Sequence, residues 1–246
     1  MRDVIAVDLF CGAGGLTRGL LDAQIKVKKG FDINEDFKQT YEKNNPGVTF
    51  TSKDVGDLTG KEITKNLDLK NNYFLLAGCA PCQPFSNINK KSLKEDDRKF
   101  LLLEFGRIVE ETKPDFIFIE NVPGLATGKG KIVFEEFKKK LEKMKYYFDY
   151  KVIDAKDYGV PQKRTRLILL ASAHKPVSLP KQTHGKEESL LPYVTVREVI
   201  SHYPRIRDGS KHKLVPNHET KALADINNMR LKYIKKDGGS RSDLPK

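Results

Sequence analysis

Two cysteines in the stretch GCAPCQPFS, residues 78–86, raise the question of what chemistry the chain performs. Cys79 and Cys82 have the C-x-x-C spacing that is typical of a redox pair or of half a zinc site. A redox pair of this type opens a helix, which Pro84 disfavours. A structural zinc site needs four ligands, and the only other cysteine in the sequence is Cys11. The remaining chemistry is that of a nucleophilic thiol.

Cys82 is the better placed of the two for that role. It follows the apolar run Tyr73–Ala77, which indicates a buried strand, and loops at the carboxyl ends of such strands bind substrates in open α/β sheets. Pro81 and Pro84 would stiffen this loop and fix the direction of the thiol. Cys79 continues the apolar run and fits a buried, inert cysteine. A thiol needs cationic neighbours or backbone amides to ionise near neutral pH.

Two further clusters supply charged groups. DFIFIENVPGL ends an apolar run with Glu120 and Asn121, and a carboxylic acid at a strand end can donate a proton. GVPQKRTRLILLA places Arg164 and Arg166 just before another apolar run. Side-chain alternation directs the two guanidinium groups the same way, toward one anion or one polar base edge. Standing alone, Glu120 would fit an acidic cap on the next helix.

A glycine-rich loop indicates a second binding site. AVDLFCGAGGLTRGL sets Gly12, Gly14 and Gly15 between the first strand and a helix, where the backbone can turn tightly and a ligand can approach it closely. The loop reads G-x-G-G and therefore differs from the dinucleotide pattern G-x-G-x-x-G. Acids stand at the ends of three successive extended stretches: Asp8, Asp32 and Asp54. Such acids suit an adenosine ligand that has no pyrophosphate to neutralise.

These residues need a sheet that brings strand ends together. Apolar runs typical of strands buried on both faces are Val4–Phe10, Tyr73–Ala77, Asp115–Ile119 and Leu167–Ala171. Helical spacing of apolar residues lies between them, around 100–111 and 133–144. Alternating strands and helices predict an α/β fold, with a mostly parallel sheet and helices on both faces.

The composition excludes several classes of protein. Hydrophobic residues make up 38% of the 246 residues, and no apolar run approaches the roughly 20 residues that span a bilayer. The N-terminus runs directly into a strand-like pattern, so we expect no signal peptide. Three cysteines are too few for a disulfide framework, which favours a reducing cytoplasm. Lys and Arg number 45 against 33 Asp and Glu, and the net charge of +12 suggests nucleic acid as partner.

In four stretches the chain resembles the bacterial DNA cytosine-5 methyltransferases. The stretches occur in the family's order and lie within residues 8–166. They are DLFCGAGG (Asp8–Gly15), PCQPFS (Pro81–Ser86), ENV (Glu120–Val122) and QKRTR (Gln162–Arg166).

The resemblance implies a Rossmann-like S-adenosylmethionine-dependent methyltransferase fold and methyl transfer to C5 of cytosine in double-stranded DNA. The target base would be flipped out of the duplex. Cys82 would attack C6 as a thiolate, Glu120 would bond N3 and the exocyclic amine, and Arg166 would hold O2. Arg164 would bind a neighbouring phosphate or the catalytic loop, and Asn121 would position that loop.

The resemblance also implies the residues that bind S-adenosylmethionine. Asp32 would hold the ribose and Asp54 the adenine amino group, while Pro81 would lie near the transferred methyl group. The full set of expected cofactor-binding residues is Phe10, Gly12, Gly14, Asp32, Asp54, Pro81 and Leu101.

The sequence analysis predicts a cofactor-binding catalytic domain over residues 1–172. After Ser172 the strand and helix pattern fades, and only Thr195–Tyr203 and Glu219–Ile234 have helical patterns. Full-length family members continue into a target-recognition domain and two further motifs, so residues 173–246 are predicted to be an extension toward a domain absent from this chain. Either a second subunit supplies the missing parts, as in split members of the family, or the chain is truncated.

Three other functions stay open. The same motifs occur in a tRNA cytosine methyltransferase. A non-catalytic DNA-binding regulatory subunit is a second alternative, against which the presence of Cys82, Glu120 and Arg166 argues. A redox protein is the third, and it predicts a disulfide between Cys79 and Cys82.

Overall fold

The computed structural model describes residues 2–81, 101–128, 130–236 and 238–245. The chain divides into two compact units, Met1–Tyr193 and Val194–Lys246. Residues 173–193, which the sequence assigns to the extension, therefore belong to the first compact unit. It stays a prediction that this extension leads into a target-recognition domain.

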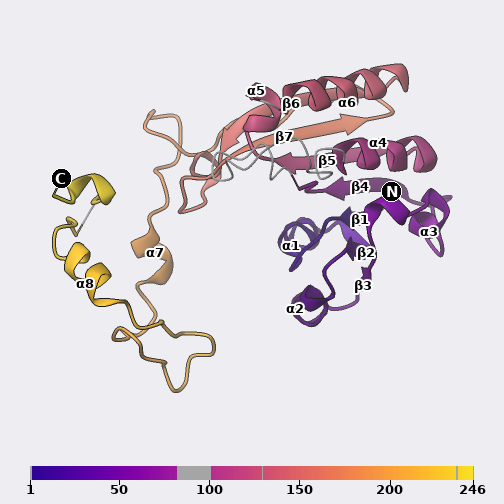
Figure 1. Ribbon diagram of the computed structural model, residues 1–246. Coiled ribbons are helices and arrows are strands. Elements are labelled where there is room, and N and C mark those ends of the chain that lie inside the picture. Colours follow the sequence, from indigo (N-terminus) through magenta and orange to yellow (C-terminus); the bar gives the residue numbers. More distant parts are fainter. Residues whose placement is uncertain (1, 82–100, 129, 237, 246) are drawn as a thin grey trace. The chain divides into compact units, whose positions relative to one another are not determined.

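The first unit is built on a seven-stranded sheet with the strand order β3-β2-β1-β4-β5-β7-β6 (Figure 1). Strands β1 to β5 pair in parallel, and β7 is antiparallel to both of its neighbours. The predicted α/β fold with a mostly parallel sheet is thus confirmed. The strands are β1 (Val4–Leu9), β2 (Lys26–Asp32), β3 (Thr49–Ser52), β4 (Tyr73–Gly78), β5 (Phe116–Asn121), β6 (Tyr147–Asp154) and β7 (Thr165–Ser172).

Helices cover both faces of this sheet. One face packs against α1 (Gly15–Asp22) and α2 (Lys38–Asn44), which contribute the buried Leu20 and Tyr41. The other face packs against helices that contribute buried side chains to the larger core cluster. Those helices are α3 (Gly60–Thr64), α4 (Leu101–Thr112), α5 (Gly124–Thr127) and α6 (Lys131–Lys143).

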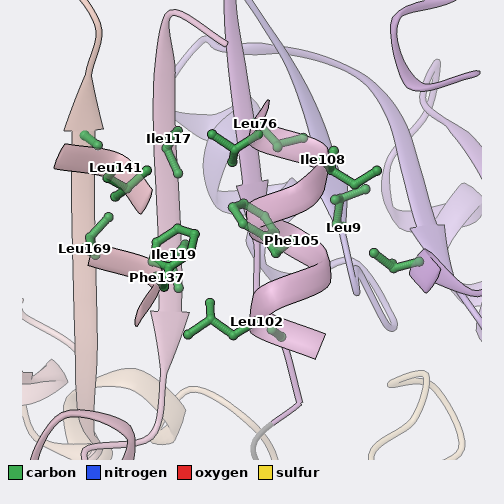
Figure 2. Close-up of a cluster of buried hydrophobic side chains, with 14 of the residues drawn as sticks. Leu9, Leu76, Leu102, Phe105, Ile108, Ile117, Ile119, Phe137, Leu141 and Leu169 are labelled. Carbon is green, nitrogen blue, oxygen red and sulfur yellow. The ribbon is translucent and has the colours of Figure 1, made fainter. Parts of the chain in front are cut away.

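The larger core fixes the strands that carry the site. Figure 2 shows Phe105 of α4 and Phe137 of α6 against Leu76 of β4 and Ile117 of β5. Each of these side chains is fully buried, and each such burial contributes about 1.5–3 kcal/mol. The carboxyl ends of β4 and β5 are therefore held on a rigid support.

The strand order also fixes where a ligand binds. The chain passes from β1 outward to β2 and β3, and then returns to β4 on the other side of β1. In open α/β sheets, ligands bind in the crevice that such a reversal leaves at the carboxyl ends of the strands. The reversal lies between β1 and β4, whose following loops carry the glycine stretch and Pro81.

One edge of the sheet differs from the sequence expectation. Strand β6 has no long apolar run, because it is an edge strand whose residues are mostly exposed or half-buried. Strand β7 begins at Thr165, so Arg166 lies within the strand and Arg164 directly before it. Because β7 pairs antiparallel with β5, its start lies beside the carboxyl end of β5.

The second unit is poorly packed. It contains the short helices α7 (Val196–Ile200) and α8 (Asp225–Leu231) and the turn η6 (Arg241–Asp243). Both helices are shorter than the helical patterns predicted. None of the residues that the structure describes in this unit is buried. Short helices depend on tertiary packing for stability, which explains why the helical patterns are only partly realised.

No helix in the described ranges has both the length and the apolar character that a membrane crossing requires.

Candidate functional site

Glu120 and two arginines meet at the carboxyl end of β5. The Nε of Arg166 lies 2.8 Å from Oε1 of Glu120, and a terminal nitrogen of Arg164 lies 3.8 Å from the same oxygen. The Glu120 and Arg166 side chains are about one quarter exposed, at 26% and 24%, and that of Arg164 is 49% exposed. The structure thus brings together three of the predicted catalytic residues in a half-open position that a ligand can reach.

The backbone holds Arg164 at this position. Its N–H donates to Oδ1 of Asp154 at 3.0 Å, and its carbonyl oxygen accepts from the N–H of Ala155 at 3.0 Å. Asp154 ends β6, and Ala155 begins the 3-10 helix η5 (Ala155–Tyr158). The start of β7 is therefore fixed while the guanidinium of Arg164 stays available for an anion.

Asn121 links β5 to the segment after β4. Its buried side chain donates from Nδ2 to the carbonyl oxygen of Ala80 at 2.9 Å and accepts from the N–H of Val122 at 2.8 Å. The chain is thereby fixed directly before the half-buried Pro81. Cys82 lies outside the described residues.

The glycine loop has the left-handed backbone that its sequence predicts. Phe10, Gly12 and Gly14 have φ values of 58°, 50° and 90°. A phenylalanine in this region is strained, and strain of this kind occurs at ligand sites. The N–H of Gly12 donates to Oδ2 of Asp32 at 2.9 Å, so the loop after β1 and the end of β2 form one unit.

Two other predicted cofactor-binding residues, Asp54 and Leu101, lie on other elements of the first unit. Asp54 follows β3 and accepts from the N–H of Gly56 at 2.8 Å, capping the turn η2 (Val55–Asp57). Asp32 and Asp54 thus lie at the ends of adjacent strands, as predicted. Leu101 begins α4 and packs against the larger core cluster.

Asp8 is one of the three strand-end acids that the sequence analysis named, but it was not included among the expected cofactor-binding residues. It is fully buried at the carboxyl end of β1, where Oδ2 accepts from the Thr17 hydroxyl at 2.7 Å. That hydroxyl also lies 2.8 Å from the Tyr41 hydroxyl. No hydrogen-bond partner for Oδ1 of Asp8 is found among the described residues. Burial raises the pKa of Asp8 to about 7, although the bond from Thr17 opposes the shift. The position of Asp8 directly before the glycine loop is the sequence signal that could have placed it in the cofactor site.

In the described ranges, no three His, Cys, Asp or Glu side chains are grouped to hold a metal ion. Cys11 and Cys79 are free thiols. Burial, followed by nearby negative charge, raises the pKa of the Cys79 thiol, so it stays protonated near neutral pH. A protonated thiol is a poor nucleophile for disulfide exchange.

The shape of the loop gives a testable prediction. In Gly14→Ala, the added Cβ would lie 2.3 Å from Nδ2 of Asn45 and 2.9 Å from the Tyr41 ring, at a φ of +90°. We expect the free energy of unfolding to fall by about 1–3 kcal/mol. Gly15→Ala is the matched control, since no heavy atom lies within 4 Å of its added Cβ. Urea unfolding compares the two, and equal losses of stability would contradict this account of the loop.

Comparison with known proteins identifies the family. Residues 4–241 match the family model described as C-5 cytosine-specific DNA methylase. The chain is 37% identical over 239 residues to the Type II methylase M.HgiDII of Herpetosiphon aurantiacus, which is 97% of this chain and 65% of that protein. The Type II methyltransferase M.AquIA of Picosynechococcus is 30% identical over 218 residues, 80% of this chain and 88% of that protein. The chain therefore spans under two thirds of the first relative's length.

Solved structures share the fold. A DNA modification methyltransferase encoded within an E. coli prophage matches with a TM-score of 0.67 at 27% identity, over 84% of this chain and 57% of that one. The Dnmt2 methyltransferase of S. pombe matches with a TM-score of 0.57 at 24% identity, over 72% of this chain and 52% of that one, and shows likeness of fold alone. The family model and the relatives show that the chain belongs to the C-5 cytosine-specific DNA methylase family.

Proposed function

We propose that this chain carries the catalytic part of a DNA methyltransferase that acts on C5 of cytosine in double-stranded DNA. The observation that carries the proposal is the contact of Glu120 with Arg166 and Arg164 at the carboxyl end of β5, two strands from β1 and its glycine loop. A carboxylate held by guanidinium groups can present one polar edge to a base. By its likeness to Type II enzymes, we place the protein in the bacterial cytoplasm, in a restriction–modification system.

The residues around the glycine loop fit S-adenosylmethionine, the methyl donor of this family and fold. The space beside Gly12 is open, and Asp32 already ties the loop to the next strand end. The buried Asp8, with one unpartnered oxygen, favours a cationic ligand at this loop through its field. Phe10, Gly12, Gly14, Asp32, Asp54, Pro81 and Leu101 would hold the cofactor. When bound, it supplies an electrophilic methyl group.

In the proposed reaction, the thiolate of Cys82 forms a bond to C6 of the flipped cytosine while Glu120, in its protonated form, supplies a proton to N3. The electron pair then available at C5 would take the methyl group as its bond to the sulfonium sulfur of S-adenosylmethionine breaks, and S-adenosylhomocysteine would leave. Loss of the C5 proton to a base expels the Cys82 thiolate, and Glu120 recovers the proton from N3. Arg166 would hold O2 of the base, and Asn121 would fix the segment before Cys82 through its bond to Ala80.

The charge of the chain supports a DNA substrate. The net charge of +12 favours a polyanion, and the half-exposed guanidinium of Arg164 is available for a phosphate. Reaction at C5 requires that the base leave the stack, because C5 and C6 cannot be attacked within the duplex.

We further propose that a second chain supplies target recognition and the C-terminal motifs. Large apolar side chains of α7 and α8 are exposed by 43–55%, and none of the described residues in their unit is buried. A partner that covered these helices would bury the apolar surface that they now leave open. M.AquIA, of which the matched segment covers 88%, is a relative of similar length. The apolar residues are Val196, Val199, Ile200, Ile226, Met229 and Leu231.

Transfer of a labelled methyl group from S-adenosylmethionine tests the function and separates it from the alternatives. We expect label in cytosine of duplex DNA when the second chain is present, little label with this chain alone, and none with Cys82→Ala. Label in tRNA instead of DNA would favour the RNA alternative. DNA binding without any label would favour a non-catalytic subunit. Strong methylation by this chain alone would contradict the need for a second chain.

A further inference from the structure

Cys79 lies between the two halves of the site. In the parallel pairing of β4 with β5, Gly78 is opposite Ile119, so the next residues along, Cys79 and Glu120, lie side by side at the carboxyl ends of the strands. Side chains alternate between faces, so Cys79 lies on the same face as Ala77. Ala77 is in turn the register partner of Asp8 on β1.

This register places the thiol of Cys79 next to the Glu120 side chain. Nearby negative charge, first from Glu120 and then from Asp8, acts on the thiol. The thiol is half-buried and free. Because it carries its proton near neutral pH, it can donate to the carboxylate.

A hydrogen bond from this thiol would give Glu120 a third donor, from a neighbouring strand. Arg166 and Arg164 both approach Oε1 of the carboxylate, at 2.8 Å and 3.8 Å. When the donors all contact one oxygen, the carboxylate can still rotate about the bond between Cγ and Cδ, because the energy minima of that torsion angle are broad. A donor from the neighbouring strand restricts that rotation.

We propose that Cys79 is a positioning residue, whose S–H donates to Glu120 and holds the carboxylate in the orientation in which it meets the cytosine ring. The inference rests on the proposed function, in which Glu120 contacts the base. The inference assigns a role to a thiol that the sequence analysis describes as buried and inert.

Two pairs of variants test this, assayed in the active enzyme, with the second chain where activity requires it. Cys79→Ala and Cys79→Val remove the donor, whereas Cys79→Ser and Cys79→Thr keep one, and Val and Thr match in shape. We expect loss of the donor to lower kcat by about 5- to 10-fold with KM changed by under about twofold. The hydroxyl variants should recover most of the rate. In a Glu120→Gln background, Cys79→Ala should cost under about twofold, because residues that act as a unit are not additive.

The outcomes separate this inference from the proposed function. Equal rates for Cys79→Val and Cys79→Thr would overturn the positioning role alone. The same conclusion would follow if Cys79→Ala lowered kcat in the Glu120→Gln background by as much as it does in the parent enzyme. Absence of methylation by the unsubstituted enzyme would overturn the proposed function and this inference with it. Thermal melting of each variant checks that it folds. If Cys79→Ala does not fold, the comparison of Cys79→Val with Cys79→Thr still tests the positioning role.

Discussion

Glu120→Gln is expected to lower the rate of DNA methylation by about 10²- to 10⁴-fold, the usual contribution of a general acid. Glutamine keeps the shape of the side chain but cannot supply a proton to N3. It also leaves Arg166 and Arg164 without the charge that now holds them, at 2.8 Å and 3.8 Å from Oε1. The side chain is 26% exposed and makes no part of either core cluster, so we expect the melting temperature to change little.

The measurement is the initial rate of methyl transfer at saturating cofactor, alongside thermal melting. Glu135→Gln on α6 is the control, since Glu135 lies 3.0 Å from Lys138 in a surface ion pair and loses the same charge. Its rate should stay within about twofold of the parent, as is usual for surface substitutions. A Glu120→Gln enzyme within about tenfold of the parent rate would contradict a proton-transfer role for this residue.

Asp8→Asn is expected to stabilise the protein without cofactor at alkaline pH and to weaken cofactor binding there. The pKa of Asp8 is raised by burial to about 7, above its value in the unfolded chain. The contribution of this group to stability is therefore fully present below pH 4 and is lost as pH rises through 7. The shift corresponds to about 4 kcal/mol, and an unpartnered amide N–H in the variant offsets part of that gain.

We therefore expect Asp8→Asn to be more stable than the parent by about 1–3 kcal/mol at pH 8 and of similar stability at pH 5. Its affinity for S-adenosylmethionine should be about tenfold lower at pH 8, because the field of a buried carboxylate favours a cationic ligand. At pH 5 the parent is protonated at this position, so the difference in affinity should disappear. Urea unfolding and calorimetric titration at both pH values check this.

The exposed Asp22 provides the control for that prediction. Asp22→Asn removes a carboxylate on α1 that pairs with Arg18 at the surface, and we expect no change of stability or affinity that depends on pH between 5 and 8. A stability gain from Asp8→Asn of equal size at pH 5 and pH 8 would show that its charge is not responsible.

The sequence predicts the centre of the sheet better than its edge. Strands β1 and β4, which are buried on both faces, appear as continuous apolar runs that periodicity detects. The apolar run of β5 was also detected, although one face of that strand is only half-buried. Strand β6 lies at the edge and has a mixed burial pattern, so no such run marks it. In the second unit, the periodicity of residues 219–234 predicts a longer helix than α8, because a helical pattern forms fully only where another surface packs against it.

The candidate site, like the sheet, could be predicted from the sequence only in part. Side-chain alternation was sufficient to predict that Arg164 and Arg166 face the same way. Their contact with Glu120 depends on the antiparallel pairing of β7 with β5, which the sequence analysis did not predict. The position of Cys79 beside Glu120 depends on the register of β4 against β5, which no local pattern fixes. The unpartnered oxygen of Asp8 depends on what α1 and α2 place around it, and contacts across elements of this kind become visible only in the folded chain.

Covalent trapping is the measurement that tests the central claim most directly. Duplex DNA carrying 5-fluorocytosine is incubated with S-adenosylmethionine and this chain, with and without the protein encoded next to it. Fluorine takes the place of the C5 proton whose loss would release Cys82, so the covalent adduct should accumulate. We predict a denaturation-resistant complex that forms with the second chain and is abolished by Cys82→Ala. The absence of any complex under both conditions would contradict the claim that this chain is the catalytic part of a cytosine methyltransferase.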